Sequence, residues 1–148
     1  MSYERLLQEG VIRPHRTNPD EIAALLSVVE RDLKDAEVPG LSSDRRFAIA
    51  YNAALQLATV VLYAEGYRST GTGHHHTTFR FLGQTTIPNK EAWADYFDAC
   101  RRKRNLADYM GVGYVSETEA DELVRETRAF AQNVREWLSA AHPYLAPG

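Results

Sequence analysis

Residues 42–66, SSDRRFAIAYNAALQLATVVLYAEG, decide the fold of this chain. The segment opens with serines, which cap the first turn of helices well, and it ends at Gly66, a residue typical of helix C-termini. Between these ends, apolar side chains recur at helical spacing, and a second apolar set widens the stripe almost around the helix. A helix that is apolar on most faces is normally buried. The sequence therefore predicts a central helix around which the rest of the chain packs.

Helix signals also dominate on both sides of this segment. Asn18 and Pro19 open a predicted helix that Pro39 and Gly40 end, and a capping box, Ser116 with Glu119, opens the last helix. The predicted helices cover residues 3–9, 18–36, 42–66, 79–82, 90–108 and 116–141.

The remaining segments, residues 11–17 and 66–77, are predicted to be connectors, because the sequence has no alternating strand pattern. We expect an all-α protein, a mostly antiparallel bundle of four to five helices. Its length suits a single domain over residues 1–148, with a core at about 18–141.

Composition and charge narrow the functional classes. A hydrophobic content of 44% is enough for a packed core, and a net charge of -3 excludes a uniformly basic coat but allows a local basic patch. With one cysteine, Cys100, no internal disulfide can form. The first ten residues lack the apolar core of a signal peptide, and no uncharged apolar run approaches the roughly 18 residues that span a bilayer. We expect a cytoplasmic protein with no membrane segment.

The chemistry is concentrated in residues 91–114, EAWADYFDACRRKRNLADYMGVGY. An apolar helical stripe runs through Trp93, Phe97 and Cys100, and the same spacing continues to Arg104. Leaving a charged side chain buried without a partner would cost several kcal/mol, so we expect Arg104 to pair with an acidic side chain or with a bound anion. We expect Arg104 to be partly buried and to face a groove.

Two interpretations of Arg104 stay open. In the first, the side chain extends past the apolar stripe and pairs with Asp108, one helical turn later. In the second, the guanidinium meets a phosphate at a groove, with Asn105 and a tyrosine beside it. Arginine suits the second task because its planar fork of N–H donors matches phosphate oxygens.

The segment RNLADY, residues 104–109, resembles the motif of HEPN domains. That motif is an Arg, usually followed by a polar residue, with a His about four to six residues further on. Some uncharacterised bacterial and archaeal branches carry an R-x3-D-Y form instead, as this chain does. The order of elements is also similar: a long apolar second helix, a loop with Gly and His, a Phe-containing segment and then the motif helix. The resemblance covers about residues 18–141.

The resemblance implies a dimer in which the Arg and His of two subunits face each other and promote metal-independent attack of an RNA 2′-hydroxyl on its phosphate. Arg104 would then bind the phosphate, and Asn105 would orient it. Tyr109 stands at the His position, and with an ordinary pKa near 10 it is a poor general base. It could still donate a hydrogen bond or stack on a base. Possible partners are RNA and, in a toxin–antitoxin or defence module, a cognate nucleotidyltransferase antitoxin; no cofactor is expected.

Three consecutive histidines in the predicted loop, His74, His75 and His76, allow two further interpretations. They cannot all reach one metal ion with good geometry, so we expect no metal site. They are either a solvated cluster, or one of them, with His76 as the candidate, reaches the groove near Arg104 and replaces the missing motif His. The candidate catalytic residues are Arg104, Tyr109 and His76. The candidate RNA- or nucleotide-binding residues are Arg101, Arg104, Asn105, Asp108, His74 and His75.

Two other functional classes remain as alternatives. One is a dimeric protein-interaction module without a substrate. The other is a metal-dependent nucleotide hydrolase, for which the carboxylate pairs Asp95-x-x-Asp98 and Glu119-x-x-Glu122 are the available ligands. The first pair has no acidic partner on the apolar faces of the other helices, and the second lies at a helix N-terminus, where the helix dipole favours acids.

Overall fold

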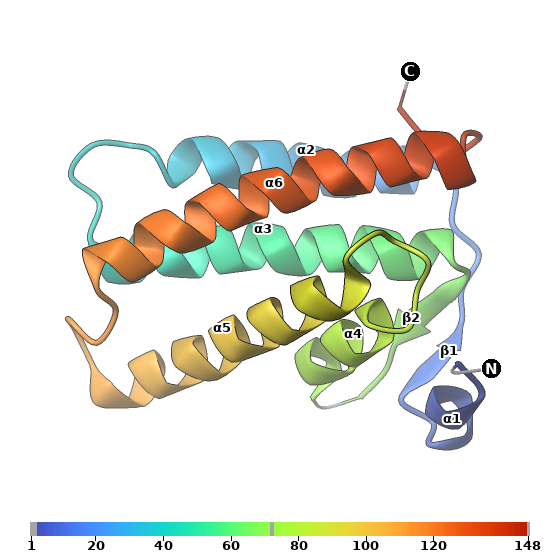
Figure 1. The fold of residues 1–148 in the computed structure, drawn as a ribbon, viewed down its shortest axis with the longest axis horizontal. Helices are drawn as coiled ribbons and strands as arrows, with labels where there is room; N and C mark the ends of the chain where they lie inside the picture. The colour runs from blue at the N-terminus through green and yellow to red at the C-terminus, as the bar shows by residue number, and fades with distance from the viewer. Residues whose placement is uncertain (1–2, 72, 148) are drawn as a thin grey trace.

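A computed structural model describes residues 3–71 and 73–147; residues 1–2, 72 and 148, including one position of the predicted loop, lie outside the described residues. The elements in chain order are α1 (Tyr3–Gln8), β1 (Ile12–Pro14), α2 (Pro19–Asp35), α3 (Ser43–Ala64), β2 (Tyr67–Ser69), α4 (His74–Leu82), α5 (Lys90–Met110) and α6 (Glu117–Ala141). Figure 1 shows a helical bundle in which α2 and α6 run alongside α3, with α4 and α5 on another side of α3. The prediction of an all-α bundle is confirmed, with two short helices, α1 and α4, beside four long ones.

The helix α3 is the centre of the bundle, as its apolar faces predicted. It packs against α2, α4, α5 and α6. By length and hydropathy alone it could also cross a membrane, but 67% of its most apolar window is buried inside the protein. Burial in the core therefore accounts for its apolar composition.

Local capping signals place the helix ends where the sequence predicted them. The Asn18 side chain accepts a hydrogen bond from the Glu21 N–H at 2.8 Å, and the Ser42 hydroxyl accepts one from the Arg45 N–H at 3.2 Å. Ser116 and Glu119 form the complete reciprocal capping box at the start of α6. These bonds satisfy N–H groups that have no partner within the helix.

The two segments predicted to be connectors contain a small two-stranded sheet, which no alternating pattern in the sequence indicated. β1 and β2 pair antiparallel, with Ile12 opposite Ser69 and Pro14 opposite Tyr67. Strands of three residues are too short to show an alternating pattern, and their pairing depends on segments far apart in sequence. The strands lie next to a small second core formed by Leu6, Ile12, Leu62 and Phe81.

The helix α4 begins at His74, whereas the sequence predicted a loop up to residue 77. Gly73 precedes it with a φ of 74°, a left-handed conformation that glycine adopts without strain. Phe79 and Leu82 on this helix are buried, and this packing overrides the weak helix preference of the histidines. The three histidines are therefore held in the first turn of a helix that packs against α3 and α5.

Candidate functional site

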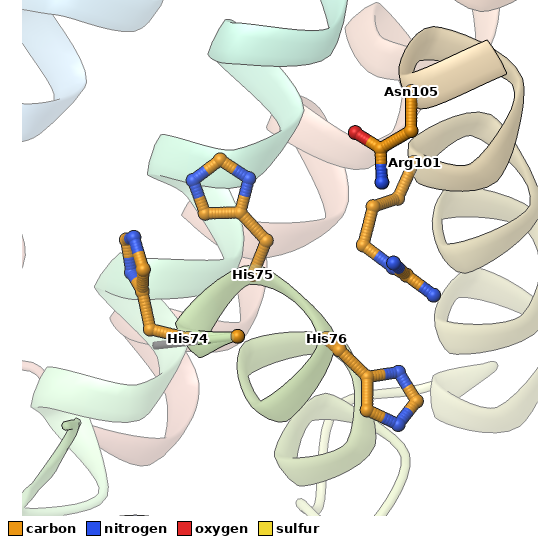
Figure 2. A pocket seen from close by; sticks show the side chains of 6 residues that line it. His74, His75, His76, Arg101 and Asn105 are labelled. Atoms are coloured by element: carbon orange, nitrogen blue, oxygen red, sulfur yellow. The ribbon is translucent and has the colours of Figure 1, made fainter. Parts of the chain in front are cut away.

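A pocket of about 280 Å³ lies where the first turn of α4 faces the motif helix α5. Figure 2 shows five of its side chains, three from α4 and two from α5. Its lining consists of Gly73, His74, His75, His76, Arg101 and Asn105. The sequence proposed all of these except Gly73 as site residues, in two separate segments, and the fold brings the two segments together.

Arg104 lies beside this pocket with its guanidinium over an aromatic ring of the core. Its Cζ is 5.4 Å from the centroid of Tyr51, which is a cation–π contact with α3. The Arg104 Nε is buried and has no hydrogen-bond partner among the described residues. The predicted partial burial of Arg104 is confirmed. The alternative pairing with Asp108 is not among the ion pairs of the described residues, and Asp108 is exposed.

Tyr51 connects Arg104 to the histidines. It is only 2% exposed, and its Oη lies 3.2 Å from the Nδ1 of His75. Burial raises the pKa of the Tyr51 hydroxyl, so the phenol remains protonated. Burial, and then the charges of His74, Arg104 and Arg101, lower the pKa of His75. His75 is therefore a neutral imidazole at pH 7.

Sequence reasoning missed Tyr51, because it stands on the apolar stripe of the central helix. The available signal was its hydroxyl, which needs a hydrogen-bond partner once the ring is buried.

Asp98 was also missed as a site residue, and it organises the other side of the pocket. Its Oδ1 accepts a hydrogen bond from the Arg101 Nε at 2.7 Å, and its Oδ2 accepts one from Arg102 at 2.6 Å. The Nδ1 of His76 lies 3.3 Å from the same carboxylate. Partial burial alone would raise the pKa of Asp98, but hydrogen bonds from Arg101 and His76 outweigh it and lower that pKa. Asp98 thus holds Arg101 and His76 in place at the pocket.

Arg104, Asp108 and Tyr109 are the candidates that do not line the pocket, and of these Asp108 and Tyr109 are exposed. The exposed fraction of Tyr109 is 92%. Tyr109 belongs to an exposed apolar surface at the end of α5, which we call the α5 tip. The α5 tip consists of Leu106, Tyr109, Met110 and Val112.

No three His, Cys, Asp or Glu side chains within residues 3–71 and 73–147 are arranged so that they could hold a metal ion. Figure 2 shows why the histidine run does not form such a group: the three rings point in different directions from the first turn of α4. The polar side chains that line the pocket are arginine, imidazole and amide groups.

The family model of SAV_6107-like HEPN domains matches residues 40–135. The match covers well over half of the chain and includes α3, α4, α5 and the RNLADY segment, so the chain belongs to the HEPN superfamily. A search of curated proteins and a search of solved structures each gave no significant match.

Proposed function

We propose that this HEPN domain binds RNA through its phosphate backbone at the pocket between α4 and α5. The observation that supports the proposal most directly is that Arg101 lines the same pocket as the first turn of α4. The first N–H groups of a helix have no partner within it and attract anions. The N-cap residue of α4 is Gly73, which has no side chain to accept hydrogen bonds from these N–H groups. The groups therefore remain available to a phosphate.

Local charge supports the same proposal. Four consecutive residues of α5, 101–104, are basic. Asp98 pairs with Arg101 and Arg102, and Glu119 pairs with Lys103. An arginine hydrogen-bonded by one carboxylate retains further N–H donors for a phosphate oxygen. Asn105, at the pocket rim, can add an amide donor. Because the whole chain carries a net charge of -3, attraction to RNA would depend on this patch.

We propose further that the domain works as a homodimer built on the α5 tip. Its residues Tyr109 and Val112 are 92% and 98% exposed, which is unusual for large apolar side chains on one short segment. Closed two-fold dimers are the commonest assembly of soluble proteins, and burying the α5 tip would place the two motif helices near each other.

The biological setting that we propose is a toxin–antitoxin or defence module with a cognate nucleotidyltransferase as antitoxin. This proposal rests on membership in the HEPN superfamily, and a gene for a nucleotidyltransferase next to this one would support it.

A binding measurement tests the function directly. We would titrate fluorescent mixed-sequence single-stranded RNA with the protein at low salt and in EDTA, and read anisotropy. Arg101→Ala should weaken binding at least tenfold, in line with roughly 1.5–3 kcal/mol for a hydrogen bond to a charged group. Arg125→Ala is the matched control, because it removes the same charge from an exposed site on α6.

Two results would contradict RNA binding at the pocket. One is the absence of binding by the wild type at low salt. The other is an equal loss of affinity in Arg101→Ala and Arg125→Ala, which would indicate general electrostatic attraction. In either case the exposed α5 tip would favour the second candidate, a protein-interaction module without a substrate.

A further inference from the structure

The RNLADY motif of this chain contains no histidine that could act as a base, and His75 lies in the pocket where such a base would be needed. Tyr109 stands where the HEPN motif has a His, but it is exposed and lies outside the pocket lining. His75 lines the pocket together with Arg101 and Asn105 of the motif helix. It comes from a different helix, α4, so no reading of the motif alone would include it.

The contact between His75 and Tyr51 sets the orientation of the imidazole. The Tyr51 Oη lies 3.2 Å from Nδ1, and the Tyr51 ring is fixed in the core with Arg104 against its face. If the Nδ1–H donates to Tyr51, the other nitrogen, Nε2, keeps a free lone pair. Protonation of Nε2 would leave that hydrogen bond intact, because the imidazolium still donates from Nδ1. A base whose second nitrogen is held by a third group is the usual arrangement in enzyme sites.

The neighbouring histidines are placed differently. His76 has its Nδ1 at 3.3 Å from the Asp98 carboxylate, and its side chain is half exposed. His74 is exposed, and in Figure 2 its ring lies farther from α5 than that of His75. Among the three, His75 is the one that combines partial burial, a hydrogen bond to a buried side chain and proximity to Arg104.

We propose that His75 is the catalytic base of RNA cleavage at this pocket, with Tyr51 as the positioning residue that orients its imidazole. The proposal rests on the RNA binding proposed above and extends it to a reaction.

In this reaction the RNA 2′-oxygen forms a bond to the adjacent phosphorus, and the bond from phosphorus to the 5′-oxygen breaks. His75 Nε2 takes the 2′-hydroxyl proton, and water protonates the departing 5′-oxygen. The resulting hydroxide then takes the proton from His75, so the products are a 2′,3′-cyclic phosphate and a 5′-hydroxyl. Arg101 would stabilise the negative charge that builds on the phosphate.

The surroundings of His75 predict how the reaction depends on pH. The groups that face it are Tyr51 from α3, Arg101 and Arg104 from α5, and His74 from its own helix. Burial and these charges lower the pKa of His75 from its ordinary 6.5, so the base form is populated at neutral pH. The rate should therefore rise with pH through a midpoint below 6.5 and be level at neutral pH.

The experiment compares the wild type with His75→Gln, Tyr51→Phe and a control, His142→Gln, which lies near the C-terminus outside the pocket. Each protein is incubated in EDTA with end-labelled single-stranded RNA, and with a DNA of the same sequence that lacks the 2′-hydroxyl. Cleavage rates, the chemical nature of the new ends, RNA affinity by anisotropy and folding by circular dichroism are measured for all four.

We expect the wild type and His142→Gln to cleave RNA but not DNA and to leave cyclic phosphates. His75→Gln should lose about a hundredfold or more in rate while its affinity for RNA changes less than twofold. Tyr51→Phe, which keeps the buried ring, should lose about tenfold in rate, with a pH profile displaced from that of the wild type and unchanged affinity.

Three results would overturn the assignment of His75. They are wild-type rates in a folded His75→Gln, RNA that is bound but not cleaved by the wild type, and cleavage that requires a metal ion. None of the three contradicts RNA binding at the pocket. A wild type that does not bind RNA overturns both proposals.

Discussion

At the scale of single residues, Arg104 makes two opposing contributions to the stability of the fold. Its cation–π contact with Tyr51 stabilises the fold by roughly 0.5–1 kcal/mol, while its buried Nε, unpartnered among the described residues, costs a comparable amount. We predict that Arg104→Ala changes the free energy of unfolding by less than about 1 kcal/mol. RNA affinity should fall about tenfold, because a charge-assisted contact is lost. Urea unfolding and anisotropy measure the two quantities, and a large loss of stability would favour a purely structural role.

The same substitution should change the titration of His75. The Arg104 cation is one of the groups that lower the pKa of His75, although burial is the larger cause. Removing the cation in Arg104→Ala should therefore raise the pKa of His75 part of the way towards 6.5. An NMR titration of the imidazole resonances checks this, and Arg125→Ala, with its site on α6, should leave the value unchanged.

Asp98 is the residue whose loss should loosen the pocket most. Asp98→Asn removes the charge that holds Arg101, Arg102 and His76 and should destabilise the protein by about 1–2 kcal/mol at pH 7. The pKa of Asp98 is lowered in the fold, so this stability is present above its ordinary pKa of 3.8 and lost as pH falls through the folded value. Urea unfolding at pH 7 and near pH 3 should show the difference shrinking at the lower pH.

Asp95→Asn is the matched control for that prediction. Asp95 is exposed on the same helix and forms none of the ion pairs found among the described residues. An equal effect of the two substitutions would show that the net charge of α5, and not the contacts of Asp98, sets stability.

At the scale of elements, the start of α6 depends on one hydroxyl. Ser116 accepts the Glu119 N–H at 3.0 Å, and the Glu119 carboxylate accepts the Ser116 N–H at 2.9 Å and pairs with Lys103 of α5. Ser116→Ala should cost about 1 kcal/mol, because a helix N–H loses its acceptor. Thermal unfolding followed by circular dichroism measures it. Ser139→Ala, at an exposed position late in α6, should be neutral or slightly stabilising.

Comparison of the helices shows which helix ends a local sequence pattern can predict. The ends of α2, α3 and α6 follow from capping residues within three or four positions of the bonds they make. The start of α4 does not, because burial of Phe79 and Leu82 against the bundle extends that helix back to His74. Packing, which the sequence pattern does not contain, decided that end.

At the scale of the whole molecule, the exposed α5 tip predicts self-association. The monomer has a mass of 16.7 kDa, and light scattering at tens of micromolar protein should give about twice that value. Met110→Glu should return the protein to the monomer, because a buried charge opposes a two-fold contact. Val38→Glu, at a half-exposed apolar position outside the α5 tip, should leave the dimer intact. A wild-type monomer at these concentrations would exclude the proposed interface.

The sequence by itself determined the helical class, the central place of α3 and the partial burial of Arg104. Each of these depends on residues three to seven positions apart on one helix, where spacing alone sets the face a side chain occupies. The tertiary structure alone decided the β1–β2 pairing and the pocket. His75 meets Tyr51 across 24 positions of chain, and His76 meets Asp98 across 22. Such contacts exist only after α4 has packed between α3 and α5, so no local pattern contains them.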